Sequence, residues 1–282
     1  MKPVLKYRGG KSKEIDEFVN LIPRDFNRYI EPFLGGGAVF FYLEPKSAIL
    51  NDVNGKLMTF YAQLKECYAT MREQLDTIER IYSENSALYK SQKEGSPLGH
   101  IIDQNEDLYY ALREKYNHPD DEYLEGVLYY FINKTSYSGM VRYNKNGEFN
   151  VPYGRYAHFN THIITDEHSK LLQNAELFND DYSRVFEMAD NNDFIFLDPP
   201  YDCIFSDYGN EQYEDGFGED EHRRLAEDFY NLNCRALMVI GETRLTNDLY
   251  HNYITGRYHK NYSVNIRNRF NAEANHLIVR NY

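Results

Sequence analysis

Residues 194–201 read Phe194-Ile195-Phe196-Leu197-Asp198-Pro199-Pro200-Tyr201, four apolar residues that lead directly into an acid, two prolines and an aromatic residue. The apolar run predicts a strand buried on both faces, as in parallel sheets. Each proline fixes φ and lacks an N–H donor, so the strand must end there. Open α/β sheets bind ligands at the carboxyl ends of their strands. The stretch therefore predicts a stiff ligand-binding turn that holds a flat molecule by its amino edge and its face; the alternative is a Pro-rich turn without a ligand.

A second strand and turn are predicted in Tyr29-Ile30-Glu31-Pro32-Phe33-Leu34-Gly35-Gly36-Gly37. A short apolar strand leads to an acid, a glycine-rich turn and the start of an apolar helix, which is typical of a βα turn in a doubly wound sheet. The glycines do not follow the GxGxxG pattern, so the dinucleotide fingerprint is absent. An acid at Glu31 would repel a pyrophosphate, but it suits a cationic amine.

Two more acids are expected at the same edge of the sheet. Residues 48–54 read as a second strand that ends in Asp52, about 20 residues after the first strand, where an acid typically bonds ribose hydroxyls. The alternative for Asp52 is a helix N-cap. Residues 177–182 read as a short strand ending in acids, of which Asp181 can accept a bond from an adenine amino group or cap the next helix.

The remaining chain predicts an insertion and a terminal hairpin. Residues 55–132 carry apolar side chains at helical spacing and predict an inserted helical module, whereas the polar residues 83–102 predict a connection. Residues 202–220 are acidic and predict a loop over the site. Residues 262–266 and 276–279 predict two strands that form an antiparallel hairpin at the end of the sheet.

The segment 133–156 breaks the helical period and mixes cations with aromatic residues. It contains only one acid, Glu148, and the pair Asn146-Gly147 predicts a hairpin turn. Cations beside aromatic rings can contact phosphates, stack on bases and read base edges. The alternative is an ordinary surface hairpin. The interleaved cations and tyrosines are Lys134, Arg142, Lys145, Arg155, Tyr137, Tyr143, Tyr153 and Tyr156.

The composition excludes several classes of protein. The net charge of -13 argues against a protein that coats nucleic acid nonspecifically. Cys67, Cys203 and Cys234 are far apart and lack metal-ligand spacing, so we expect no metal site and a reducing, cytoplasmic compartment. No apolar run approaches membrane-spanning length, so we expect no membrane partner. The oligomeric state is left open between monomer and dimer.

Five motifs in this order resemble the Dam-type adenine-N6 DNA methyltransferases. They are Leu5-Lys6-Tyr7-Arg8-Gly9-Gly10-Lys11, Glu31 to Gly37, Asn51-Asp52-Val53-Asn54, Arg142-Tyr143-Asn144 through Gly154, and Asp198-Pro199-Pro200-Tyr201. The resemblance implies a Rossmann-like methyltransferase sheet with a terminal antiparallel hairpin and an inserted helical target-recognition module. It divides the chain into a catalytic domain, 1–55 with 161–282, and a recognition domain, 56–160. A bacterial, phage or viral origin is compatible with this family.

The resemblance also implies S-adenosylmethionine as cofactor and double-stranded DNA as partner. In the family the aromatic residue at Tyr7 is more often Trp. The implied cofactor contacts are Tyr7, Gly10, Lys11, Glu31, Pro32, Phe33, Gly35, Gly37, Asp52, Val53, Asp181 and Asp198. The implied catalytic residues are Asp198, Pro199, Pro200 and Tyr201, which would hold N6 of a flipped-out adenine and stack on its ring.

The implied DNA contacts lie mainly in the segment 133–156. Tyr137 matches an aromatic residue that wedges into the duplex, and Arg142 matches an arginine that reads guanine. Ser138 stands where related enzymes often carry Asn. The full set is Lys11, Lys134, Tyr137, Ser138, Met140, Arg142, Asn144, Asn150, Pro152, Tyr153 and Arg155. The implied target is adenine in GATC.

The residues of this chain fit three other functions less well. Cytosine-C5 methylation needs a cysteine in a Pro-Cys context, and no cysteine here follows a proline. Cytosine-N4 enzymes usually carry Ser where Asp198 stands, so this activity is a minor alternative. The third is a catalytically inactive, sequence-specific DNA-binding protein on the same fold, which the intact cofactor and catalytic motifs argue against.

Overall fold

The computed structural model describes all residues except 8, 96–100, 202–216 and 262–272. The described chain forms two compact units. The helical unit comprises Met1–Gly10 and Gly55–Gln173, and the sheet unit comprises Lys11–Asn54 and Asn174–Tyr282.

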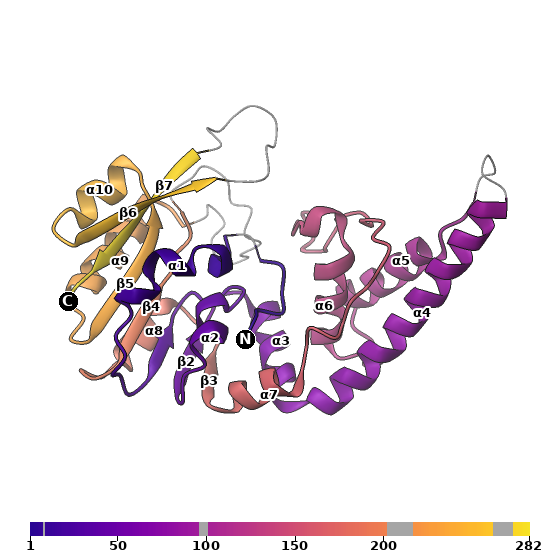
Figure 1. The fold of residues 1–282 in the computed structure, drawn as a ribbon, viewed down its shortest axis with the longest axis horizontal. Coiled ribbons are helices and arrows are strands. Elements are labelled where there is room, and N and C mark those ends of the chain that lie inside the picture. The colour runs from indigo at the N-terminus through magenta and orange to yellow at the C-terminus, as the bar shows by residue number, and fades with distance from the viewer. Residues whose placement is uncertain (8, 96–100, 202–216, 262–272) are drawn as a thin grey trace. The chain divides into compact units, whose positions relative to one another are not determined.

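The sheet unit has a seven-stranded sheet in the order β3-β2-β1-β4-β5-β7-β6 (Figure 1). The strands β1 to β5 run parallel, whereas β7 pairs antiparallel with both β5 and β6. This arrangement confirms the predicted Rossmann-like sheet with an antiparallel end. The bounds are β1 (Tyr29–Glu31), β2 (Ala48–Asn51), β3 (Ala175–Phe178), β4 (Phe194–Leu197), β5 (Arg235–Gly241), β6 (Ile254–Asn261) and β7 (Glu273–Arg280).

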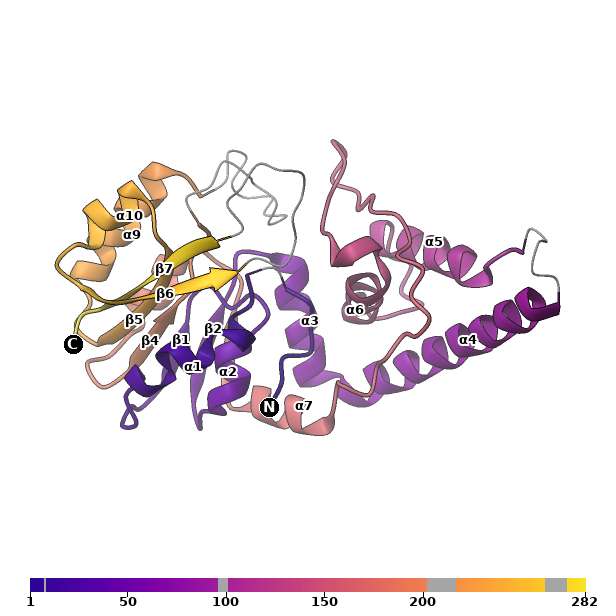
Figure 2. The same ribbon diagram turned by 45° about the horizontal axis from the view of Figure 1, so that its top comes forward.

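The strands of the terminal hairpin, β6 and β7, lie side by side in Figure 2. The predicted strand 276–279 falls within β7. The other predicted strand, 262–266, lies outside the described residues, and β6 ends just before it at Asn261. Most of the predicted acidic loop 202–220 also lies outside them, and α9 begins at Glu219.

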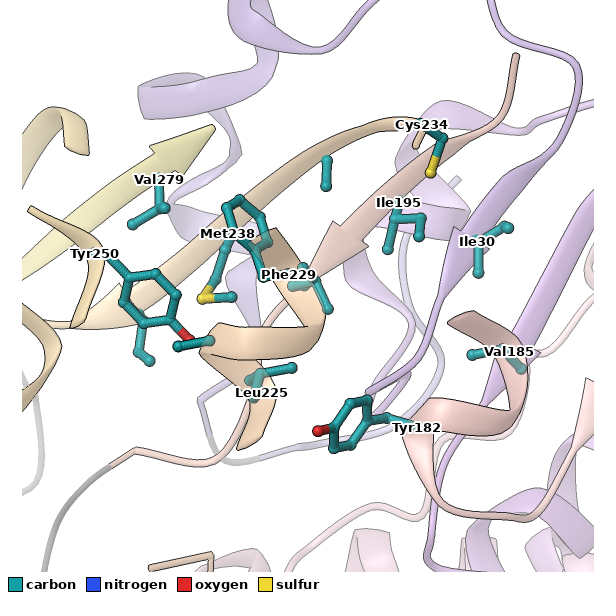
Figure 3. Packing of buried hydrophobic residues seen from close by; sticks show 14 of the residues in the cluster. Ile30, Tyr182, Val185, Ile195, Leu225, Phe229, Cys234, Met238, Tyr250 and Val279 are labelled. Atoms are coloured by element: carbon teal, nitrogen blue, oxygen red, sulfur yellow. The ribbon is translucent and has the colours of Figure 1, made fainter. Parts of the chain in front are cut away.

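The strand β4 is buried along its whole length, as its apolar sequence predicts. Because side chains alternate along a strand, Ile195 and Leu197 belong to one apolar cluster, whereas Phe196 stacks on Phe18 of α1 with ring centroids 5.4 Å apart. Figure 3 shows the first cluster, in which Leu225 and Phe229 of α9 face the sheet beside Met238. Helices therefore cover both faces of the strand. The helices of the sheet unit are η1 (Lys11–Lys13), α1 (Ile15–Phe18), η2 (Val19–Leu21), α2 (Ala38–Leu43), α8 (Tyr182–Glu187), α9 (Glu219–Tyr230) and α10 (Arg244–Tyr250).

The helical unit is built from amphipathic helices whose apolar faces pack together. The buried positions Leu57, Phe60, Tyr61 and Leu64 follow the predicted helical spacing. The helices are α3 (Gly55–Glu66), α4 (Tyr68–Gly95), α5 (Gln104–Asn117), α6 (Glu125–Thr135), η3 (Tyr137–Gly139) and α7 (Asp166–Gln173).

One prediction for this unit was wrong. The polar residues 83–102 were expected to form a connection, but α4 continues as far as Gly95. Residues 83–94 contain no glycine or proline, and seven of these twelve residues are Glu, Lys, Gln, Ala or Leu, which favour helix even when the surface is polar. The break signals Pro97 and Gly99 lie outside the described residues.

The division of the chain also differs from the predicted boundaries. Residues 1–10 belong to the helical unit, because Asn133 of α6 bonds both the N–H and the carbonyl of Lys6, at 2.9 and 2.7 Å. The helix α7 belongs to the same unit, and the ring of its His168 lies 3.0 Å from the carbonyl of Lys2. Long-range polar contacts, rather than position in the sequence, set these boundaries.

Candidate active site

The predicted acids gather at the carboxyl edge of the parallel strands. The order of the sheet reverses between β1 and β4, which pair through Tyr29 with Phe194 and Ile30 with Ile195. Glu31 ends β1 and Asp198 directly follows β4. This is the topological switch point at which open α/β sheets bind ligands.

The glycine-rich turn after β1 is closed by Asp52. Gly35 and Gly37 have φ values of 49° and 65°, which other residues rarely adopt. The N–H of Gly35 donates to Oδ2 of Asp52 over 2.8 Å, and the N–H of Asn54 donates to Oδ1 over 2.9 Å. Asp52 is thus a brace between the ends of β1 and β2, and its burial raises the pKa of its carboxyl group.

Glu31 is a buried acid, with only 3% of its surface exposed. It accepts a hydrogen bond from the hydroxyl of Tyr29 over 2.9 Å. Burial raises the pKa of Glu31 well above its usual range, and the nearby charges of Asp198 and Asp52 raise it further. Within the described part of the chain, no Lys or Arg forms a salt bridge with Glu31 or Asp52. The acids beside the glycine turn therefore suit a ligand that carries positive charge.

We expect Glu31→Gln to stabilise the ligand-free protein at alkaline pH. The pKa of Glu31 is higher in the folded protein than in the unfolded chain. Its contribution to the free energy of unfolding is therefore complete below about pH 4.5 and is lost as the pH rises through the pKa of the folded state. The substitution should raise the free energy of unfolding by ~1–2 kcal/mol at pH 8 and change it little at pH 4. Urea unfolding checks this, with the exposed Glu17→Gln as the control; a gain of equal size at both pH values would contradict it.

Asp198 is held by Lys11 from the first turn of the sheet unit. The ammonium of Lys11 lies 2.6 Å from Oδ1 of Asp198 and donates to the hydroxyl of Tyr201 over 2.7 Å. Burial raises the pKa of Asp198, and the charge of Lys11 opposes this shift. Among the described residues no donor reaches Oδ2 of Asp198, and 21% of the side chain is exposed. One carboxylate oxygen is therefore anchored, and the other can accept a bond from a ligand.

The Tyr201 ring is fixed from several sides. A side chain at Gly241, at the end of β5, would come 3.6 Å from Cγ of Tyr201, so the ring lies against the bare backbone there. The ring of His276 meets it edge-on at 5.2 Å between centroids. Pro199 is buried and Pro200 is half-buried between the acid and the ring. The two prolines thus hold an acceptor and an aromatic face close together.

Other predicted cofactor residues make contacts within the protein itself. The carbonyl of Pro32 accepts from Asn51 over 3.0 Å, and the ring of Phe33 packs on Tyr182 at 5.5 Å. Asp181 accepts from the N–H of Ser183 and thereby caps α8, as one of its two predicted roles required. Val53 is half-buried beside Asp52.

The second oxygen of Asp181 forms a salt bridge with Arg224 over 2.7 Å. Burial raises the pKa of Asp181, but the bonds from Ser183 and Arg224 outweigh it, and the net pKa is below its usual value. Asp181 is thus an ionised helix cap.

The predicted DNA contact of Lys11 and the predicted cofactor contacts of Tyr7 and Gly10 involve residues whose surroundings differ from the expectation. Lys11 is 2% exposed and bound to Asp198, so a direct contact with DNA is not supported. Tyr7 and Gly10 lie in the helical unit, where the N–H of Gly10 donates to the carbonyl of Tyr7 over 3.2 Å.

Within the helical unit, the basic segment 133–156 forms a compact turn. Tyr143 and Phe149 form an isolated antiparallel bridge, as do Ser136 and Tyr153. Gly147 has a φ of 75°, as its predicted turn position requires. The side-chain oxygen of Asn144 accepts the N–H groups of Asn146 and Glu148, at 2.9 and 3.0 Å. The predicted hairpin is therefore a turn closed by side-chain bonds, with single bridges in place of long paired strands.

Several predicted DNA-contacting side chains of this segment are accessible. Tyr137 is 56% exposed, and Ser138 has a φ of 55°, a value at which Asn is favoured over Ser. The exposed Arg142 donates to the side chain of Asn150 over 2.6 Å and to its carbonyl over 3.1 Å. Asn150 thus orients the Arg142 guanidinium. Met140 is half-buried and Pro152 is exposed.

Tyr153 is a correction to the predicted set. It is 5% exposed, its hydroxyl lies 2.6 Å from that of Tyr82, and its ring packs on Tyr109. Contacts with Tyr82 of α4 and Tyr109 of α5 bury Tyr153, so it anchors the basic segment to these helices. Arg155 is paired with Glu106 over 3.2 Å. Lys134 is half-buried, and burial together with Lys6 lowers its pKa to about 8.

We expect Gly154→Ala to destabilise the basic segment. A Cβ at Gly154 would lie 2.8 Å from the carbonyl oxygens of both Thr135 and Ser136, which are backbone atoms that cannot rotate away. The free energy of unfolding should fall by ~1–3 kcal/mol. Thermal unfolding measures this. Gly95→Ala is the control, because a Cβ there meets nothing within 4 Å at the end of α4 and is expected to be neutral or stabilising.

The sequence did not indicate the polar contact between Glu14, which lies one turn after Lys11, and Tyr258. Glu14 accepts a bond from Tyr258, 244 residues away in the sequence, and no local pattern marks such a pair. Among the described residues, no group of three or more His, Cys, Asp or Glu side chains could hold a metal ion. None of the described helices is both long enough and apolar enough to span a membrane.

Comparison with known proteins gives consistent matches along the chain. Residues 7–266 match the family described as "D12 class N6 adenine-specific DNA methyltransferase". The chain is 35% identical to the type II methyltransferase M.CviBI of Paramecium bursaria Chlorella virus NC1A, over 100% of both chains. It is 33% identical to the type II methyltransferase M.MjaIII of Methanocaldococcus jannaschii, over 85% of this chain and 83% of the relative. It is 29% identical to the DNA adenine methylase of Haemophilus influenzae, over 80% and 73%.

Proposed function

The chain belongs to the family of D12 class N6 adenine-specific DNA methyltransferases, and from this premise we propose that it methylates N6 of a flipped-out adenine in duplex DNA, in the sequence GATC. The proposed methyl donor is S-adenosylmethionine. The observation that carries the proposal is the anchored carboxylate of Asp198, beside the Tyr201 ring at the switch point of the sheet.

The cofactor supplies a methyl group activated by the positive charge on its sulfur. The acids Glu31 and Asp52, with the glycine turn between them, support binding of such a cation, because they are buried and lack a basic partner in the described chain. The glycines of this turn lack side chains, which also favours close approach of a ligand at the helix start. Contacts from Tyr7 and Gly10 remain predictions from the resemblance.

The amino nitrogen of adenine is a poor nucleophile, because its lone pair is delocalised into the ring. We assign to Oδ2 of Asp198 and the carbonyl of Pro199 the role of accepting its two N–H bonds, which orients the lone pair toward the methyl group. The carboxylate also stabilises the positive charge that develops on nitrogen. Tyr201 offers a ring for stacking. A base inside a duplex cannot reach such a turn, so it must leave the helix.

The basic segment is the proposed reader of the target. The exposed ring of Tyr137 suits stacking against the bases, and Arg142, held by Asn150, suits a bidentate contact with guanine. Ser138, Met140, Asn144 and Pro152 are the proposed neighbouring contacts. Lys134 and Arg155 are proposed to neutralise phosphates.

Arg142→Ala should relax specificity at one base pair by ~1–3 kcal/mol, because the bidentate contact with guanine is lost. Methylation rates on duplexes that differ at single positions of the target measure this loss. The control is Lys145→Ala, an exposed cation of the same turn, which should weaken binding to all sequences equally and reduce the salt dependence. Equal rate losses on every duplex in the Arg142 variant would contradict its assignment.

The direct test uses purified protein, S-adenosylmethionine and unmethylated plasmid, followed by single-molecule sequencing of the product. We expect N6-methyladenine in GATC and none in a parallel reaction with Asp198→Asn. Methyladenine in another sequence would overturn the target, and N4-methylcytosine would overturn the assigned base. Sequence-specific binding without methylation would instead support the inactive DNA-binding protein.

A further inference from the structure

Glu14 is a buried carboxylate one turn after Lys11 that the proposed reaction does not use. It is 6% exposed. Its side chain accepts from the hydroxyl of Tyr258 over 2.6 Å and from the ammonium of Lys260 over 2.5 Å, and it lies 3.0 Å from Nδ1 of His276. The three partners come from β6 and β7, at the far end of the chain.

Glu14 is ionised throughout the range in which such an enzyme works. Burial alone would raise its pKa, but the bond from His276, the charge of Lys11 and the bonds from Lys260 and Tyr258 lower the pKa to about 2. The N–H of Glu14 also donates to the carbonyl of Lys11 over 2.8 Å, which fixes the short turn between them. Lys11 is therefore bound directly to Asp198, while the charge of Glu14, one turn further along, acts on it through space.

The same network reaches the catalytic ring by a second route. His276 is fully buried, and its ring meets Tyr201 on one side and Tyr258 on the other, both at 5.2 Å between centroids. The hydroxyl of Tyr258 lies 3.0 Å from Nδ1 of His276. A shift of β6 or β7 would thus be transmitted to both Lys11 and Tyr201.

We propose that Glu14, Tyr258, Lys260 and His276 form a positioning network that sets the place and the electrostatic surroundings of Lys11, and so tunes Asp198 as the acceptor for the target amine. This inference rests on the proposed function of Asp198. The four residues contact no substrate in it; they act through Lys11 and through the orientation of Tyr201.

The charges in this network predict opposite effects for two substitutions. Removing the negative charge of Glu14 favours the ionised form of Asp198, so the acidic limb of the rate profile should move to lower pH. Removing the positive charge of Lys260 disfavours that form, so the limb should move to higher pH. The titratable and charged groups that face Glu14 or Asp198 are Lys11, Tyr29, Glu31, Tyr201, Tyr258, Lys260 and His276.

The experiment measures single-turnover methyl transfer to unmethylated plasmid between pH 5 and 9 for the full-length protein. Glu14→Gln should shift the acidic limb down, and Lys260→Met should shift it up, each by ~0.5 unit or more. The double variant should return the limb to within ~0.2 unit of the parent, because the two charge effects oppose each other. Tyr258→Phe removes a hydrogen bond without a change of charge, so it should lower the rate and leave the limb in place.

The matched control is Asp193→Asn, a buried carboxylate at the amino end of β4 that is paired with Arg28 over 2.6 Å. It should lower stability without moving the limb. The proposal would be overturned if the acidic limb of the rate profile kept its position in both Glu14→Gln and Lys260→Met, or if it shifted in the same direction in both. If Glu14→Gln does not fold, Lys260→Met alone decides by its sign. Full activity in Asp198→Asn would instead overturn the proposed function itself.

Discussion

Asp198→Asn is expected to lower the rate of methyl transfer by at least ~10³-fold at pH 7.5, a loss of ~4 kcal/mol in transition-state stabilisation. The amide keeps the shape of the carboxylate but removes its charge, so it cannot stabilise the cation that forms on N6. It also leaves the ammonium of Lys11, which is 2% exposed, without the carboxylate that now binds it at 2.6 Å. The effect should therefore fall on the chemical step.

Single-turnover transfer of labelled methyl groups separates this loss from weaker binding. We expect the affinity for DNA to change less than tenfold, since Asp198 is proposed to contact only the flipped base of the target. The control is Asp193→Asn, at the opposite end of the same strand, where the carboxylate is buried and paired with Arg28. This variant should lose stability, by ~3 kcal/mol or more, yet keep its rate while folded. Comparable rates in both variants would show that Asp198 acts through the fold.

The part of this site that could be predicted lies where local sequence determines local structure. An unbroken apolar run followed by two prolines can form little other than a buried strand that stops, and β4 does stop at Leu197. Glycines at Gly35 and Gly37 have positive φ because the turn requires it. The order of the strands then follows from the connectivity of doubly wound sheets, which brings Glu31 and Asp198 to neighbouring strand ends.

The part that could not be predicted depends on contacts between distant segments. Lys11 and Asp198 are 187 residues apart in the chain, and neither one's neighbours indicate the pair. The burial of Tyr153 depends on contacts with α4 and α5, and its neighbours Pro152 and Gly154 do not indicate whether its ring is buried or exposed. The length of α4 was missed for another reason: polar composition was taken as a sign of a loop, although helix propensity in 83–94 is high.

Lys11→Met should lower the rate by ~10²-fold at pH 7 and move the acidic limb of the rate profile to higher pH by ~1 unit. Methionine keeps most of the length and apolar stem of lysine, so the buried site can be filled without a charge. Burial already raises the pKa of Asp198, and the charge of Lys11 is the largest influence that opposes it. Without that charge, a greater share of Asp198 is protonated at neutral pH and cannot accept the bond from N6.

This reasoning predicts partial recovery of the Lys11→Met variant at pH 9, where Asp198 ionises again. The loss that remains there measures the second role of Lys11, its bond to the hydroxyl of Tyr201. The control is Lys13→Met, an equal change of charge on an exposed residue of the same turn, which should leave the limb unmoved. If Lys11 served DNA phosphates instead, the loss would appear in the affinity for DNA and its salt dependence, and raising the pH would restore nothing.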